Sequence, residues 1–233
     1  MSSIRSVDVG NQLDWLSRST ERRDPIHRVD EGLPPGFEAY LRLFHPFVPW
    51  DWDSELGETP PRTRTWRSLA EACSVVFHAE LTWPSLLSAL PLTGHRRPWA
   101  VNSGWIDEPV RSHLFGVLAD ISPTSIGFFY YGLSRLVGGF EPVLLIAPLD
   151  AFVEVDAEPA VVRHPPSGPE FLWPEDRAWV LWTDYDLSSS YLACSRALSK
   201  RLVEDEHLEV LEVTRQTRID DGADIVNGHP AEA

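Results

Sequence analysis

The residues best suited to chemistry lie in two short acidic stretches of the chain. They share a pattern of carboxylates beside an arginine and a tryptophan: Trp173, Glu175, Asp176, Arg177, Asp184 and Asp186. Two carboxylates spaced as in Asp184-Tyr185-Asp186 can bind a divalent cation through hard oxygen ligands, as they do in sugar-nucleotide transferases. Aspartates are also common in tight turns, because the side chain bonds its own backbone. A structural turn is the favoured interpretation, recognition of a ligand or partner comes second, and metal-dependent catalysis comes last.

Sequence motifs that would indicate a familiar chemistry are missing. The chain contains no GxxxxGK[ST] or GxGxxG phosphate loop, no HExxH zinc motif and no GxSxG nucleophile motif. His78-Ala79-Glu80 lacks the PCxxC segment that accompanies HxE in zinc deaminases. His45, before a proline at the end of an apolar run, is expected to be a packed side chain rather than a base. We therefore expect no catalytic residue, no metal and no cofactor, although ligands far apart in sequence would leave no motif.

The charge of the chain argues against a nucleic-acid partner. The sequence has 20 Lys and Arg against 35 Asp and Glu, a net charge of −15. Nucleic-acid binding depends on clustered basic residues that release counterions from the phosphates. The first residues contain no apolar signal segment, and no later run approaches the ~18 apolar residues of a membrane helix. With Cys73 and Cys194 expected to be reduced, the sequence predicts a cytoplasmic protein that binds neither nucleic acid nor membrane.

The distribution of apolar residues divides the chain into three parts. Residues 1–30 have few apolar anchors and are expected to be mobile, apart from a short helix around Leu13 and Leu16. Residues 31–216 contain the periodic apolar segments and are predicted to form one domain. From Thr217 this periodicity is lost, and the last 31 residues carry two basic against nine acidic residues. Residues 217–233 are therefore predicted to form a disordered acidic tail.

Three helices are predicted from the spacing of apolar residues inside the domain. The first covers 66–77, with Thr65 as its N-cap. Its buried face comprises Trp66, Leu69, Ala70, Cys73, Val76 and Phe77. The second lies within 109–120, and the third follows an N-cap at Ser195.

Strands are predicted where short runs are rich in β-branched and aromatic residues. These runs are the second half of 37–47, then 125–133, 142–149, 151–156 and 208–213. Residues 177–194 are expected to form a hairpin with an Asp/Ser turn. Helices and antiparallel strands grouped in this way indicate an α+β fold, a single domain with a mainly antiparallel sheet and about three packed helices.

Two segments of the domain carry a resemblance to other proteins. LPPGFEAYLRLFHP at 33–46 and WPEDRAWVLWTDYDLSSSYLACS at 173–195 resemble a group of uncharacterised actinobacterial proteins. In that group PPxFEAYxRxxHP opens the domain, and WPEDRAW followed by T-[DE]-x-D and Gly-Ser closes it. The resemblance covers most of 33–214, and this chain has Cys194-Ser195 where the group more often has Gly-Ser. It implies a single domain and supplies no activity; a looser similarity to immunity-type α+β domains that bind toxins is topological only.

Two functions of different class remain. The first is a non-catalytic binding or accessory protein of the immunity type, with an acidic and Trp-rich surface for a protein partner. Ten tryptophans occur, and Trp50 and Trp52 in an acidic loop are the pair expected to be exposed. The second is a metal-assisted enzyme built on Glu175, Asp176, Asp184 and Asp186. Convergence of these carboxylates in a cleft would favour the enzyme.

Overall fold

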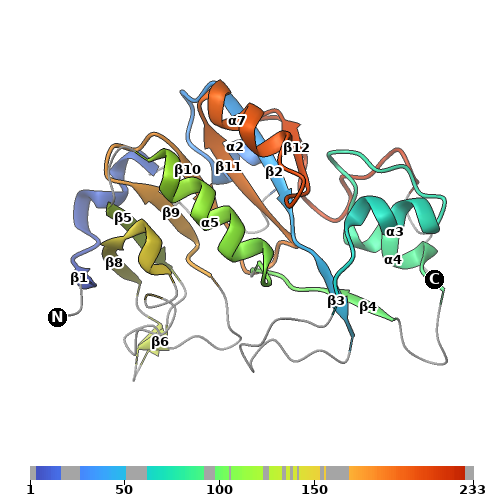
Figure 1. Ribbon diagram of the computed structural model, residues 1–233, viewed down its shortest axis with the longest axis horizontal. Helices are drawn as coiled ribbons and strands as arrows, with labels where there is room; N and C mark the ends of the chain where they lie inside the picture. The colour runs from blue at the N-terminus through green and yellow to red at the C-terminus, as the bar shows by residue number, and fades with distance from the viewer. Residues whose placement is uncertain are drawn as a thin grey trace.

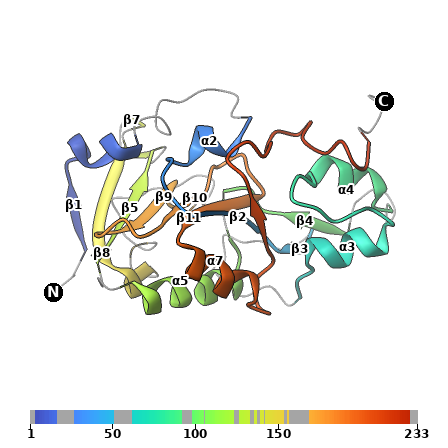
Figure 2. The ribbon, with the colours of Figure 1, turned by 90° about the horizontal axis from the view of Figure 1, so that it is seen from above.

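One large antiparallel sheet occupies the centre of the computed structural model of the protein (Figure 1). The structure describes residues 4–16, 27–50, 62–91, 98–104, 106–122, 126–132, 135–136, 139–140, 142–152, 155 and 168–228. The first and the last described segments of the chain lie on opposite sides of the molecule, as Figures 1 and 2 both show.

Eight strands form the sheet, in the order β1-β8-β5-β9-β10-β11-β2-β12, and every neighbouring pair is antiparallel. They are β1 (Arg5–Val7), β2 (Ala39–Phe44), β5 (Ile126–Tyr131), β8 (Val143–Pro148), β9 (Phe171–Pro174), β10 (Val180–Trp182), β11 (Ser189–Cys194) and β12 (Val210–Val213). Two further ribbons pair β3 (Phe47–Pro49) with β4 (Trp99–Val101) and β6 (Arg135–Leu136) with β7 (Gly139–Phe140). The prediction of a single α+β domain with an antiparallel sheet is confirmed.

Helices cover both faces of this sheet (Figure 2). The helices α5 (Val110–Ile121) and α7 (Arg196–Val203) lie on one face, and the 3₁₀ helix η1 (Gly10–Leu16) and α2 (Val29–Gly32) lie on the other. The two faces follow the alternation of side chains along each strand. Leu41 and Leu43 of β2 belong to the core under α5 and α7, whereas Tyr40 belongs to the core of the opposite face. All six residues of β2 are buried because both faces are covered.

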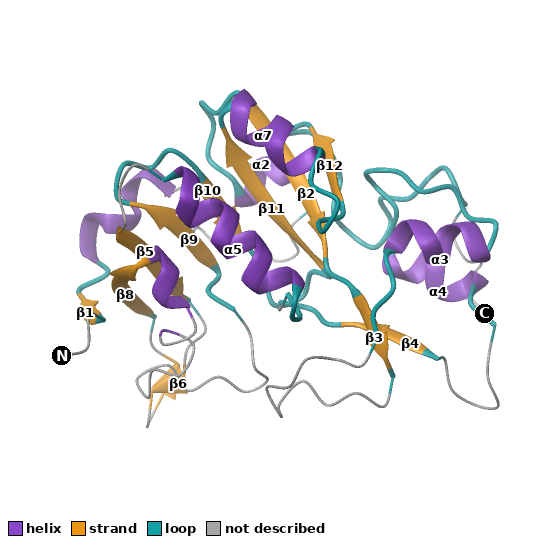
Figure 3. Ribbon diagram, viewed as in Figure 1, coloured by secondary structure: helices purple, strands orange, loops and turns teal. Residues whose placement is uncertain are grey.

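A third core lies beside the sheet, where β2 continues into β3. The β3-β4 ribbon packs there with α3 (Trp66–Ala72) and α4 (Trp83–Ala89), as Figure 3 shows. Phe47, Trp66, Leu81 and Leu86 are fully buried in this cluster. We call the β3-β4 ribbon together with α3 and α4 the α3-α4 unit. Because β2 continues into β3, the chain joins the sheet directly to this unit. The pocket described below forms at the junction of the two.

The predicted helix at 66–77 is shorter in the structure. Thr65 caps it as expected, since its Oγ1 accepts a hydrogen bond from Ser68 N at 3.1 Å. The helix ends at Ala72, and Ser74 adopts a left-handed φ of 58° that stops helical continuation. Trp66, Leu69 and Ala70 are buried as predicted, but Val76 is 55% exposed because it lies beyond the helix.

Of the other predicted helices and strands, some are confirmed and one is wrong. α5 and α7 are confirmed, and Ser195 Oγ accepts the capping hydrogen bond from Leu198 N. The strand predicted at 151–156 is wrong for the described residues, since the 3₁₀ helix η3 (Leu149–Ala151) occupies its start. Phe152 and Val155, three positions apart, are both buried, a spacing that suits a helical turn. α2 and α4 were not predicted, and β1 was not predicted either.

Both chain ends carry more structure than predicted. Near the start, β1 pairs with β8, and Leu13 and Leu16 of η1 are buried on the sheet. Near the end, Ile219 and Ala223 are buried within 217–228, the segment predicted as disordered. Single apolar residues that enter gaps between elements leave no periodic signal, which is why the sequence did not reveal them. No helix in the described ranges is both long and apolar enough to cross a bilayer.

Candidate functional site

The structure separates the acidic residues that lie close in sequence. Glu175, Asp176 and Arg177 are exposed in the turn between β9 and β10, whereas Asp184 and Asp186 follow the far end of β10. A strand advances about 3.3 Å per residue, so the two groups lie roughly 20 Å apart. A single metal ion therefore cannot be bound by both groups. The four carboxylates do not converge in a cleft.

The other two residues of the predicted set, Trp173 and Arg177, each pack against an aromatic side chain. Trp173 is buried and stacks on Phe128, with ring centroids 5.4 Å apart and planes 9° from parallel. The Arg177 guanidinium lies 5.0 Å from the centre of the Trp15 ring, a cation–π arrangement. Trp50 is the exposed tryptophan among those described, while Trp52 lies outside the described residues. A Trp-rich surface is therefore not found in the described part of the chain.

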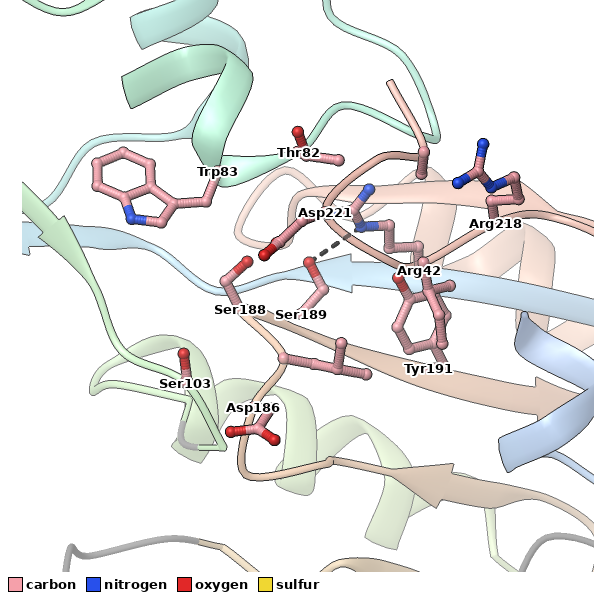
Figure 4. Close-up of a pocket in the computed structure, with 13 residues that line it drawn as sticks. Arg42, Thr82, Trp83, Ser103, Asp186, Ser188, Ser189, Tyr191, Arg218 and Asp221 are labelled. Carbon is pink, nitrogen blue, oxygen red and sulfur yellow. Dashed lines mark hydrogen bonds between the residues drawn. The ribbon is translucent and has the colours of Figure 1, made fainter. Parts of the chain in front are cut away.

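A small pocket opens where the sheet, the α3-α4 unit and the segment 217–228 meet (Figure 4). Its volume of about 70 Å³ has room for about five water-sized groups. Arg42 of β2 and Tyr191 of β11 form its floor, and Asp186, Arg218 and Asp221 lie around it. The pocket suits a small polar group rather than a nucleotide.

The floor is built from a cross-strand pair. Arg42 and Tyr191 are register partners on β2 and β11, so their side chains share one face of the sheet. Arg42 Nε donates to Ser189 Oγ at 3.0 Å, and Nη1 donates to the Ala79 carbonyl at 2.7 Å. The guanidinium also lies 4.2 Å from the centre of the Phe44 ring. These contacts fix the arginine at the junction of the sheet and the α3-α4 unit.

The electrostatics of this floor are unusual. Arg42 is only 5% exposed, and burial lowers the pKa of its guanidinium, yet an arginine stays charged in a protein. Within the described ranges no carboxylate lies within ion-pair distance of it, and Nη2 makes no hydrogen bond. Burial also raises the pKa of Tyr191, so its hydroxyl remains a neutral donor. A buried cation and a buried hydroxyl thus face the pocket with unused donors.

A glycine in a left-handed backbone conformation lies beside the rim of the pocket. Gly104 has a φ of +67°, and a Cβ at this position would lie 2.7 Å from Tyr185 Cα. Its N–H donates to the Leu187 carbonyl at 3.0 Å. Only glycine accommodates both the left-handed backbone and this close approach. The contact brings Ser103 and Asp186 together beside the pocket.

The acidic rim balances the basic floor. Arg218 already forms an ion pair with Asp220. In contrast, Asp186 and Asp221 are exposed, and neither forms an ion pair with another described residue. The pocket therefore offers a buried positive charge at its floor and two carboxylates at its edge.

Beside the pocket, His45 is the packed side chain that the sequence predicted. It is fully buried, its Nδ1 donates to the Asn102 carbonyl at 2.9 Å, and its Nε2 accepts from Ser190 Oγ at 2.9 Å. The carbonyl can only accept, which assigns the proton to Nδ1. Burial lowers the pKa of His45 to about 4, so the ring is neutral at physiological pH. With both nitrogens occupied, it is not available as a base.

Arg42 was not among the site residues predicted from the sequence. The signal was present as a single charge inside the buried run Ala39–Phe44, where an arginine is rare without a partner. The sequence also gives no sign of a second group, His113, Asp205 and His207, in which one possible ligand atom from each residue lies within 4.8 Å of the other two. Its members come from α5 and from the turn after α7, so no local motif exists.

Comparisons of the chain with known protein families, with curated proteins and with solved structures give no match.

Proposed function

We propose that this chain is a binding protein whose pocket holds a small carboxylate ligand on Arg42 and Tyr191. The observation that supports this is the buried Arg42 guanidinium, which faces the pocket without a carboxylate partner among the described residues. A ligand carboxylate would complete the ion pair and accept hydrogen bonds from Nη2 and from the Tyr191 hydroxyl. Such a bond forms in a site largely shielded from water, where it is stronger than at the surface.

The rim narrows the chemical class of ligand. Asp186 and Asp221 stand at the edge of a pocket whose floor is cationic. A zwitterion such as a small α-amino acid presents its carboxylate and its ammonium group within one short molecule. Its carboxylate would lie on Arg42 and its ammonium group would face the rim carboxylates. The volume of about 70 Å³ matches a ligand with few heavy atoms.

The competing explanation is that Arg42 only joins β2 to the α3-α4 unit. Its hydrogen bond to Ala79 and its stacking on Phe44 and Trp66 serve that purpose. A purely structural role would leave Tyr191 unimportant for binding, because no described residue hydrogen-bonds to its hydroxyl. Tyr191 therefore separates the two explanations.

Calorimetric titration with alanine, propionate and ethylamine tests the proposal. Alanine should bind most tightly because it alone carries both charges. Propionate should bind more weakly and ethylamine least. Tyr191→Phe should weaken alanine binding by about tenfold, since loss of one hydrogen bond to a charged group costs roughly 1.5 kcal/mol.

A matched control is Arg218→Gln, which changes a pocket cation already paired with Asp220. This variant should bind alanine nearly as well as the unchanged protein. The proposal would be contradicted if neither alanine nor propionate bound, or if the Tyr191→Phe variant bound alanine as tightly as the unchanged protein. Thermal melting of each variant checks that the fold persists.

A protein partner is the second candidate, and one observation favours it. Val76, Ile225 and Val226 are 55, 73 and 57% exposed, and they are adjacent because Asn227 bonds the backbone of Val76. Exposed apolar residues that lie together are typical of interaction surfaces. Partners captured from the native host by the unchanged chain, but lost with Ile225→Asp, would support this function. Equal capture by both would count against it.

The metal-assisted enzyme built on the acidic turns is not favoured by the structure. Its carboxylates lie at opposite ends of β10 and face different surroundings. Binding is therefore the function that the geometry supports best.

A further inference from the structure

We infer that His113, Asp205 and His207 form a binding site for a divalent transition-metal ion such as Zn²⁺. One ligand atom from each of the three residues lies within 4.8 Å of the other two. The site is separate from the Arg42 pocket and does not depend on its function.

Two elements bring these side chains together from distant parts of the sequence. His113 lies in the first turns of α5, and Asp205 follows the C-terminal end of α7. The turn at 205–208 folds back, since Leu208 N donates to the Asp205 carbonyl and His207 N donates to Asp205 Oδ1 at 2.9 Å. Leu202 and Leu208 on either side of this turn are buried and anchor it. The position of both ligands in the turn is thus fixed by the fold.

The distances are close to those that a metal ion needs. His113 Nε2 lies 2.8 Å from Asp205 Oδ2, and His207 Nδ1 lies 3.5 Å from Asp205 Oδ1. Around a tetrahedral zinc with bonds of about 2.0–2.1 Å, ligand atoms are about 3.3 Å apart. The two imidazole rings are near neighbours, with centroids 4.6 Å apart. Small side-chain rotations would therefore suffice to surround an ion.

The donor set selects the type of metal. Two imidazole nitrogens and one carboxylate oxygen suit Zn²⁺ and similar first-row ions, whereas Mg²⁺ and Ca²⁺ prefer oxygen ligands. Three protein ligands leave one tetrahedral position for water or for a further ligand. The net charge of −15 also favours the approach of a cation.

Metal binding would connect α5 to the turn between α7 and β12. Both helices pack on the same face of the sheet, over the core that contains Leu114 and Leu202. An ion that binds only the folded arrangement raises stability by mass action. The expected consequence is a metal-dependent rise in melting temperature.

The test uses the full chain without a polyhistidine tag, after removal of metals with a chelator. Calorimetric titration with ZnCl₂ should show one ion per chain, and the melting temperature should rise with zinc. Titration with CoCl₂ should give the visible absorption of a tetrahedral cobalt complex. A chelator should reverse both effects.

The decisive variant is His207→Ala, because His207 is 75% exposed and its loss should leave the fold intact. It should weaken zinc binding by at least about tenfold, as losses at supporting residues alone reach 10–100-fold. His27→Ala is the matched control, since His27 is also exposed and its ring lies 3.7 Å from a carboxylate, that of Asp220, outside the proposed site. It should bind zinc normally.

Two results would overturn the inference. The first is the lack of one-to-one zinc binding at zinc concentrations up to about 1 mM. The second is unchanged zinc affinity in both His207→Ala and Asp205→Asn. Either result would leave His113 and Asp205 as a simple hydrogen-bonded pair.

Discussion

His45 shows how one buried side chain makes the stability of the fold depend on pH. Its neutral ring connects three elements through Asn102, Ser190 and, by way of Ser190, Thr183. Burial lowers the pKa of His45 to about 4, compared with about 6.5 for an exposed histidine. Between these values the unfolded chain binds a proton that the folded protein excludes. The stabilising effect is therefore complete above about pH 6.5 and is lost as the pH falls towards 4.

We expect His45→Gln to remove this dependence. The unchanged protein should be more stable than the variant at pH 7, and the difference should shrink by about 1.4 kcal/mol for each pH unit below 6.5. Urea unfolding at pH 7, 6, 5 and 4.5 measures the difference.

Asp107 is a second buried group whose titration affects stability over the same pH range. Burial raises the pKa of Asp107 to about 6, so the folded protein holds its proton more firmly and this group opposes the effect of His45. Both proteins keep Asp107, and its contribution cancels in the difference to a first approximation. A stability difference that stays constant from pH 7 to 4.5 would show that His45 is not held neutral.

At the scale of elements, α3 is attached to the sheet by a carboxylate from a distant part of the chain. Glu209, just before β12, accepts hydrogen bonds from Trp66 N at 2.6 Å and from Arg67 N at 2.8 Å. These N–H groups belong to the first turn of α3, where no intrahelical partner exists. Burial raises the pKa of Glu209, although the two backbone hydrogen bonds oppose the rise.

Replacement of Glu209 by Ala should therefore destabilise the protein by about 1–3 kcal/mol, because two backbone donors lose their partner. Glu206→Ala, at an exposed position in the preceding turn, should change stability by less than about 0.5 kcal/mol. Denaturant unfolding of both variants gives the comparison. Equal losses would show that Glu209 does not cap α3.

The length of α3 leads to a second element-scale prediction. Leu69 is 4% exposed inside α3, whereas Val76 is 55% exposed beyond its end. Leu69→Ala should cost about 2–5 kcal/mol through loss of buried surface and creation of a cavity. Val76→Ala should cost less than about 0.5 kcal/mol. A large loss at Val76 would indicate that the helix continues to 77, as the sequence pattern predicts.

At the scale of the whole molecule, the segment 217–228 closes the pocket and spans two cores. Arg218 N donates to Glu80 Oε1 at 2.9 Å, and His78 lies 2.9 Å from the buried Asp224. Ile219 packs on the sheet core beneath α2. These contacts join the end of the chain to both the sheet and the α3-α4 unit.

A chain that ends at Gln216 should consequently be less stable than one that ends at Gly228. The shorter chain loses the buried Ile219 and Ala223 and the partner of His78, which should lower the free energy of unfolding by several kcal/mol, about 1–3 kcal/mol for each buried feature. Thermal melting and binding of a dye to exposed apolar surface compare the two. Identical melting would restore the interpretation of 217–228 as a dispensable tail.

Local elements were the part of the structure that the sequence determined. Ser195 caps α7, residues 110–121 form a helix and the hairpin joins β10 to β11, because caps, periodicity and turn residues act over a few positions. The α+β class followed from the order of these elements. The end of α3 could not be predicted from the sequence. The apolar spacing continues past Ser74 as in a helix, whereas Ser74 adopts a left-handed conformation.

The site was decided by tertiary structure alone. Arg42 and Tyr191 are 149 positions apart and meet only because β2 enters the sheet beside β11. His113 and Asp205 meet because α5 and the end of α7 pack on one face. Conversely, Asp176 and Asp184 are close in sequence but are held apart by an extended strand. Residues that are close in sequence stay close in space in turns and helices, but an extended strand moves them apart. Strand pairing brings together residues that no local sequence pattern connects.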